Sequence, residues 1–480
     1  MNGLSFPGHG WLGMELQWWV LITLGIGSFM GALNAGIVNI MLPVIRQSFG
    51  ADLSSIEWVL MAYLLTLCIL LLSFGRLGDI LGYKRVYIAG LLTFIIGSGL
   101  CGISPNETFL IAARVGQAIG AAMVISNASA ILTSQFPAEQ RGQLLGIQLT
   151  AGYLGLLVGP ALGGYLTDLL GWRSVFFLNL PIGLVAAAMS FWIIPSHRPA
   201  GARESFDLVG AGAMTIGMGA LLLGISKGQD LGWTSPLILG MIALSAISLV
   251  FFLRFERSLS YAMLDLGLFR SRLFKAATAS AFLNYLCVFS ASFLLPFYLM
   301  QGRSFTPSFA GLLITAQPLA MAMVAPISGY LSDRMGSRLL STSGSVIILI
   351  TLFALRNLGQ ESNVWEIVVP LFCLGIGSGL FVSPNTSAIM GSAPPNRQGV
   401  ASGIVATARS LGMVFGVAIG GAVLSLQIAL RAAGQAESQL AFFGAFQDTF
   451  LVLSIIAIIA ASTSLVRGAG DEETRPRFVH

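Results

Sequence analysis

The sequence predicts an all-α polytopic membrane protein, and three observations carry this prediction. Of the 480 residues, 55% are hydrophobic and only 9% are charged, with a mean hydropathy of +0.84, whereas soluble proteins carry about 25% charged residues. Long apolar runs recur along the whole chain, and its second part repeats its first. Because lipid offers backbone groups no hydrogen-bond partners, runs of this length are expected to form helices.

Membrane-spanning helices of about 20 apolar residues account for most of the chain. We expect fourteen, near residues 18–43, 57–74, 86–104, 108–133, 143–167, 174–194, 208–226, 236–253, 274–300, 309–331, 339–356, 365–390, 400–427 and 446–466. Most of the lysines and arginines then fall in loops on the side that holds both termini. By the positive-inside rule, both termini are expected to be cytoplasmic.

Glycine positions reveal an internal repeat. Six glycines of the fifth predicted helix recur in the thirteenth, each pair with the same separation: Gly142, Gly146, Gly155, Gly159, Gly163 and Gly164 match Gly399, Gly403, Gly412, Gly416, Gly420 and Gly421. We therefore expect a six-helix half at 1–200, an inserted helix pair with its loop at 201–272, and a second six-helix half at 273–480. Parallel repeats of this kind occur in transporters that bind substrate between their halves.

Two short polar loops occupy matching places in the repeat. The first runs from Gly75 to Arg85 and the second from Gly329 to Arg338. Their candidate functional residues are Gly75, Asp79, Gly82, Lys84, Arg85, Gly329, Asp333, Gly336 and Arg338. Any membrane hairpin could show a solvated turn of this kind, but the recurrence of glycine and aspartate in both copies favours a specific role.

The fifth predicted helix carries a row of small residues, with a proline among them: Gly155, Gly159, Pro160, Gly163 and Gly164. Glycines at this spacing make a smooth face against which another helix packs closely. Close packing alone is therefore the alternative to a functional role. The proline removes a backbone hydrogen bond and bends the helix.

Charged residues inside spans are costly and usually functional. Arg114 and Arg409 are the two arginines within predicted spans, and snorkelling toward the membrane surface is the competing interpretation for Arg114. Together with polar residues of other spans they form the expected cavity, whose members are Asn34, Tyr63, Arg114, Asn127, Gln317, Asn385 and Arg409. No carboxylate lies well inside a span. Glu57, Glu366 and Asp448 are expected at helix beginnings, where the helix dipole favours an acid.

The chain resembles the major facilitator superfamily, and within it the fourteen-helix drug:proton antiporter branch. The resemblance rests on the following segments: Gly75–Arg85, the antiporter motif Gly155–Gly164, Leu33–Pro43, Trp58–Leu65, Trp172–Arg173 with Asn179–Gly183, and Ala112–Gln117. It implies alternating access between two halves, with Asp79 and Asp333 clamping their cytoplasmic ends. It also implies proton coupling through Arg114, export rather than uptake, and a location in the plasma (inner) membrane.

The chain departs from this branch at Asn34, where the family carries aspartate. An amide cannot hold a proton or pair with a cationic drug, so the expected cavity is positively charged and suits neutral or anionic amphiphiles better than lipophilic cations. Three functions stay open: a proton-coupled exporter of hydrophobic or amphipathic compounds, an exporter of anionic or lipid-like amphiphiles or an uncoupled carrier, and a non-transporting sensor or channel. The paired loops and the repeat favour a carrier.

The sequence shows no motif typical of an enzyme, a metal site or a nucleic-acid-binding protein. No constellation of an enzyme or a Walker loop is present, and the three histidines, His9, His197 and His480, lie in polar termini or loops. We therefore expect no enzyme activity, no metal and no cofactor. The scattered cations give no nucleic-acid footprint. The expected partners are a small amphipathic substrate, protons and the bilayer, and the chain is expected to be a monomer.

Overall fold

The computed structural model describes residues 16–135, 141–195, 208–258, 266–393, 398–433 and 438–465. The side chains of Asp79 and Asp333, the two loop aspartates, lie outside this description. Within these ranges, 13 helices are long and apolar enough to cross a membrane, and one helix has a shorter apolar stretch, Gly212–Gly228. The structure thus confirms the all-α membrane fold.

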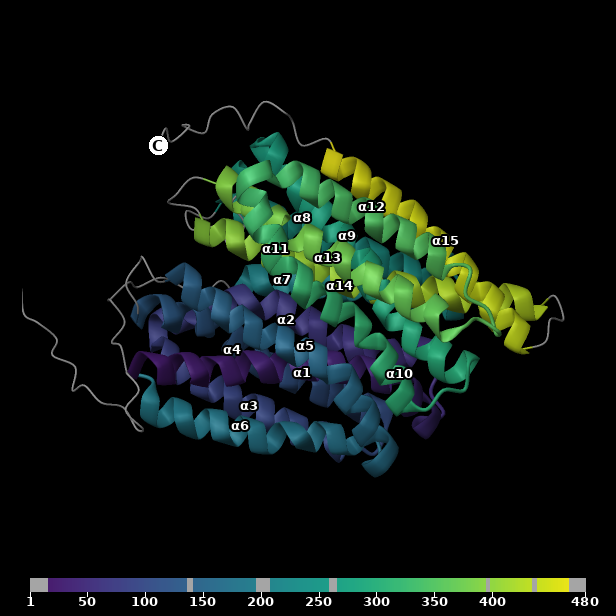
Figure 1. Cartoon of the computed structure of the whole chain (residues 1–480), viewed down its shortest axis with the longest axis horizontal. Helices are drawn as coiled ribbons and strands as arrows, with labels where there is room; N and C mark the ends of the chain where they lie inside the picture. The colour runs from purple at the N-terminus through teal and green to yellow at the C-terminus, as the bar shows by residue number, and fades with distance from the viewer. Residues whose placement is uncertain are drawn as a thin grey trace, which may run out of the picture.

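Six helices form the first half of the bundle. They are α1 (Leu16–Phe49), α2 (Leu53–Leu81), α3 (Tyr83–Gly102), α4 (Glu107–Gln135), α5 (Arg141–Leu170) and α6 (Arg173–Ile193). In Figure 1 this half, purple to blue, lies below the second half, green to yellow. Each helix packs mainly on helices of its own half, as α1 does on α5 and α3 on α4.

The second half begins with a short 3-10 helix and continues through seven α-helices. Its elements are η3 (Leu266–Arg270), α9 (Arg272–Phe297), the π-helical turn η4 (Tyr298–Gly302), α10 (Pro307–Ile314), α11 (Ala316–Met335), α12 (Ser337–Leu355), α13 (Val364–Ser392), α14 (Gln398–Ala433) and α15 (Ser438–Leu465). The predicted span at 309–331 is confirmed as one candidate span, Pro307–Ser332, in which a turn at Thr315 joins α10 to α11.

Between the halves lies the pair α7 (Leu208–Leu231) and α8 (Pro236–Ser258). These two helices pack on each other, and α7 also contacts α2 of the first half and α14 of the second. Helix α7 therefore touches both halves, whereas α8 packs chiefly on α7 and is largely exposed.

The two predicted hairpin turns have the same backbone geometry. Gly82 links α2 to α3 with φ of 95°, and Gly336 links α11 to α12 with φ of 83°. Residues with a Cβ rarely adopt this conformation, which explains why glycine stands at both places. The end of the bundle that holds these turns is called here the motif end, and the other the opposite end.

Candidate functional site

Arg114 lies at the centre of a polar cluster inside the first half. Its Nε donates to the carbonyl of Val59 (3.0 Å), and its Nη1 donates to Gln117 Oε1. The guanidinium carbon lies 4.1 Å from the centre of the Tyr63 ring, a cation–π distance. Arg114 is fully buried, so it does not snorkel to the membrane surface.

Asn34 joins the same cluster through Gln117. Its Oδ1 accepts hydrogen bonds from Gln117 Nε2 (3.2 Å) and Asn179 Nδ2 (3.4 Å), while Gln117 also donates to Ser98 Oγ (2.7 Å). All of these side chains are buried. We call this set the Arg114 cluster: Asn34, Tyr63, Ser98, Arg114, Gln117 and Asn179. It draws on α1, α2, α3, α4 and α6.

Arg409 belongs to a different environment. It lies 11 residues after the start of α14, about 16 Å along the helix axis, and its side chain is exposed. It lies close enough to Tyr153 of α5 to interact with it electrostatically, and Tyr153 also interacts with Tyr285 of α9. A charge at this depth needs water around it, so the Arg409 site, formed by Arg409, Tyr153 and Tyr285, is a wet surface between the halves.

The three remaining members of the expected cavity make contacts elsewhere. Asn127 donates to the carbonyls of Phe74 and Met123, and Asn385 donates to the carbonyl of Ala277. Gln317 accepts from Ser292 Oγ (3.2 Å). The structure therefore brings together Asn34, Tyr63 and Arg114 and places the others apart from them.

The glycine rows place helices in close contact in both halves. A Cβ on Gly155 would meet the backbone of Phe29 on α1, and one on Gly412 would meet the backbone of Phe282 on α9. Gly159 and Gly163 continue the first contact, and Gly416 and Gly420 the second. The last glycine of each row instead touches the other half: Gly164 packs on Pro307 of α10, and Gly421 packs on Glu57 of α2.

Contacts at the opposite end hold the two halves together. Asp168 of α5 accepts hydrogen bonds from the backbone nitrogen (2.8 Å) and the hydroxyl of Ser308 on α10. Arg46 Nη1 donates to Gln301 Oε1 (3.1 Å). Nearer the middle, Asn39 Nδ2 donates to the carbonyl of Ser292 (2.7 Å). The opposite end is therefore closed.

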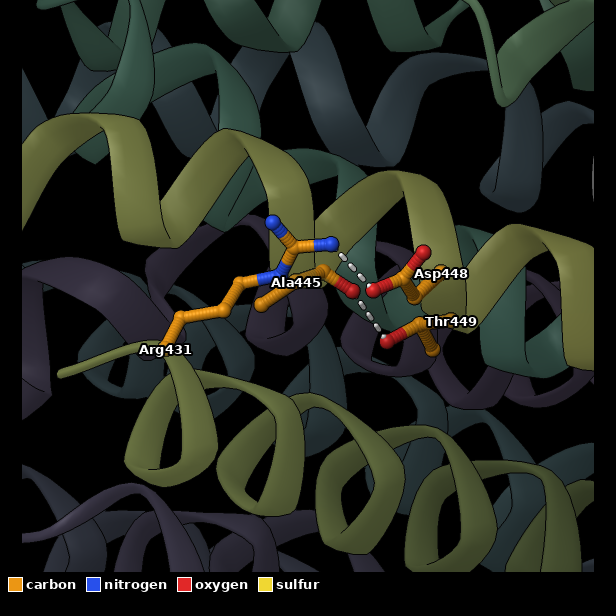
Figure 2. Close-up of polar contacts among 4 residues, drawn as sticks. All are labelled: Arg431, Ala445, Asp448 and Thr449. Atoms are coloured by element: carbon orange, nitrogen blue, oxygen red, sulfur yellow. Dashed lines mark hydrogen bonds and ion pairs between the residues drawn. The ribbon is translucent and has the colours of Figure 1, made fainter. Parts of the chain in front are cut away.

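Two acids have roles that the sequence did not indicate. Glu57 lies in the first turns of α2 as expected, but it is buried against α14. Asp448 was expected at a helix beginning, yet α15 starts ten residues earlier, at Ser438. Figure 2 shows Asp448 paired with Arg431 of α14 (2.5 Å) beside the Thr449–Ala445 hydrogen bond. That pair joins two helices of one half.

At the motif end, the described loop residues make contacts within the first half. Lys84 Nζ donates to the carbonyl of Phe191 on α6 (2.7 Å). Gly78 leaves room for Asn127, since a Cβ there would collide with the Asn127 side chain. The clamp expected from Asp79 and Asp333 concerns side chains outside the described part of the structure, and it stays a prediction.

Comparisons with known proteins agree with this geometry. A riboflavin transporter of Clostridioides difficile is 35% identical over 409 residues, which cover 84% of this chain and 88% of that protein. The multidrug resistance protein Stp of Mycobacterium tuberculosis is 34% identical over 406 residues, covering 84% and 75%.

A solved peptide transporter in complex with sulfate superposes with a TM-score of 0.68 at 15% identity, covering 97% of this chain and 98% of the other, and this likeness concerns the fold alone. The family model of the Major Facilitator Superfamily matches residues 24–269 and 277–477. This chain therefore belongs to the major facilitator superfamily, as a multi-pass membrane transporter.

Proposed function

We propose that this transporter exports hydrophobic or amphipathic compounds by alternating access, with both termini in the cytoplasm. The two halves, α1–α6 and α9–α15, would rock about the substrate, opening first at one end and then at the other. One relative is named a multidrug resistance protein and another a riboflavin transporter, which supports a small-molecule substrate for this chain as well.

The Arg409 site is the observation that carries the proposal. An exposed arginine deep in a span lies near Tyr153 of the other half, and Tyr153 in turn lies near Tyr285. Such a site would give a substrate one charged contact and apolar surface. Tyrosines supply such surface together with a polar tip. Sites for small ligands commonly combine mostly apolar walls with a few polar groups in this way.

The closed opposite end supports the direction of access. Asp168, Gly164 and Gly421 bring the halves together there, so substrate would reach the Arg409 site from the motif end. If that end is cytoplasmic, as the distribution of cations predicts, the structure represents a state that loads substrate from the cytoplasm. Asp79 and Asp333 would then close the motif end in the other state.

A second candidate differs in cargo or coupling. Asn34 stands where the antiporter branch has aspartate, and the Arg114 cluster contains no acid among its described contacts. This favours an exporter of anionic or lipid-like amphiphiles, or a carrier that is not driven by protons.

Transport by the purified protein in liposomes tests both candidates. The first predicts that uptake of a cationic dye into inside-out vesicles rises when the vesicle interior is acidic and collapses with a protonophore. A rate of dye transport that does not depend on the pH gradient would reject proton antiport. Competition by an anionic amphiphile, stronger than that by a cationic one of equal length, would favour the second candidate.

A further inference from the structure

The Arg114 cluster holds a positive charge that no acidic group of the described residues neutralises. An arginine side chain keeps its proton in proteins, and Arg114 is fully buried. Burying an unpaired charge costs several kcal/mol even after relaxation of its surroundings. Such a charge persists in a folded protein when something of opposite sign lies beside it.

Neutral groups make up all described contacts of this guanidinium. It bonds to the carbonyl of Val59 and the amide of Gln117, and it stacks on the ring of Tyr63. The electrostatic neighbours that act on it are Tyr63 and Cys101, and no carboxylate is among them in the described part of the chain. No described group balances this charge, so an ion from outside the protein is a candidate for that role.

Among the described residues, two buried donors in this cluster have no acceptor at hydrogen-bond distance and angle. They are Nη2 of Arg114 and Nδ2 of Asn34. The orientation of the Asn34 amide is defined, because its Oδ1 accepts from both Gln117 and Asn179. The side chains of Asn34 and Arg114 are linked through Gln117. The Tyr63 ring lies against Arg114, and its hydroxyl is a weak hydrogen-bond partner of the Asn34 side chain.

Both unpartnered groups are hydrogen-bond donors, so a ligand between them would be a hydrogen-bond acceptor. Because Arg114 is positively charged, that ligand is expected to carry a negative charge. We propose that a small inorganic monoanion of the chloride type binds between Arg114 Nη2 and Asn34 Nδ2. This ion takes the electrostatic role that a carboxylate at position 34 would have. In this chain an exchangeable anion would thus stand where the antiporter branch has the carboxylate of an aspartate.

Thermal unfolding of the full-length protein in detergent tests the site. Chloride is titrated against gluconate at constant ionic strength, with sodium as the common cation. A ligand that binds the folded state raises Tm in proportion to the logarithm of its concentration once that exceeds Kd, and this rise is expected for the unmodified protein. In the Asn34→Asp variant the carboxylate supplies the charge, so the chloride-dependent rise should disappear.

The matched control is Asn284→Asp. Asn284 is also a buried amide in a span, bonded to Ser280 and Ser345 in the second half. This variant should keep the chloride dependence of the unmodified protein. Equal Tm values in chloride and gluconate for the unmodified protein would overturn the proposal, as would an undiminished chloride effect in Asn34→Asp.

A second measurement does not depend on variants that fold. Crystals of the unmodified protein grown in bromide should give an anomalous peak in contact with Arg114 and Asn34. Bromide peaks at the protein surface only, with neutral water beside Arg114, would contradict the proposal.

Discussion

Asp168 on α5 caps the first turn of α10, since its carboxylate accepts a hydrogen bond from the backbone nitrogen of Ser308 (2.8 Å) and another from the Ser308 hydroxyl. An acid at a helix N-terminus satisfies a donor that has no partner within the helix and interacts favourably with the dipole. Here the acid and the helix belong to different halves of the protein. The contact therefore exists only while the opposite end is closed.

Replacing Asp168 with alanine should shift the protein toward opening at the opposite end. Losing an N-cap costs about 1 kcal/mol, so the ratio of open to closed protein should rise roughly fivefold. Distances between spin labels placed on the two halves at that end would report the change.

The control for this variant is Asp448→Ala, which removes the ion pair with Arg431 inside one half. It should leave the distribution of spin-label distances between the two halves unchanged. If the spin-label distances in Asp168→Ala match those in the unmodified protein, the hydrogen bonds of Asp168 do not stabilise the closed end.

Gly155→Ala should destabilise the protein and slow transport. A methyl group at this position meets the backbone of Phe29 on α1, and overpacking of this kind costs about 1–3 kcal/mol. Gly152→Ala, one helical turn away, is the matched control, because a Cβ there has nothing within 4 Å. Equal Tm values for the two variants would refute a close-packing role for the glycine row.

Arg409→Ala should weaken substrate binding without affecting folding. A hydrogen bond to a charged group contributes about 1.5–3 kcal/mol, so Kd should rise about tenfold to a hundredfold. Because the side chain is exposed, Tm should stay nearly constant. Arg254→Ala, which removes an exposed arginine of α8, serves as the control in the same binding assay, and equal affinities for the two variants would exclude a substrate contact at Arg409.

Asp79→Ala should abolish transport in liposomes while the protein still elutes as a folded species. The carboxylate is expected to hold the motif end closed in one state of the cycle, and a carrier that cannot close one end cannot complete the cycle. Glu361→Ala, at an exposed position between α12 and α13, is the control. Undiminished transport by Asp79→Ala would end the clamp hypothesis.

Lys227→Met should loosen the contact between α7 and α2. The ammonium donates to Ser54 Oγ (2.9 Å) and lies 3.5 Å from Ser55 Oγ, so about 1 kcal/mol of stability should be lost. Lys275→Met removes an exposed lysine of α9 and should leave Tm unchanged. If both variants melt alike, the lysine does not anchor α7.

Much of the fold was predictable because its signals are local or periodic. Apolar runs of sufficient length mark the helices, and the glycines of α5 and α14 recur in register because both rows pack on an equivalent neighbour. The turns at Gly82 and Gly336 were visible because positive φ favours glycine.

The candidate sites were predictable only in part. Arg114 was identified because a charge is costly in lipid, and Asn34 because it stands where the antiporter branch has aspartate. A sequence does not show which helix faces which. Gln117 lies three residues after Arg114, a spacing that puts both on one helix face and could have indicated their bond. Asp168 was not recognised, because its partner Ser308 lies far along the chain.

The beginnings of α2 and α10 occupy equivalent places in the repeat, yet they are held differently. Ser308 meets a carboxylate supplied by the other half, whereas Ser54 meets the ammonium of Lys227 from the inserted pair. Trp58 and Ser226 strengthen this second attachment. Removing α7 would therefore remove these contacts of Ser54 and Trp58, whereas Ser308 would keep its contact with Asp168.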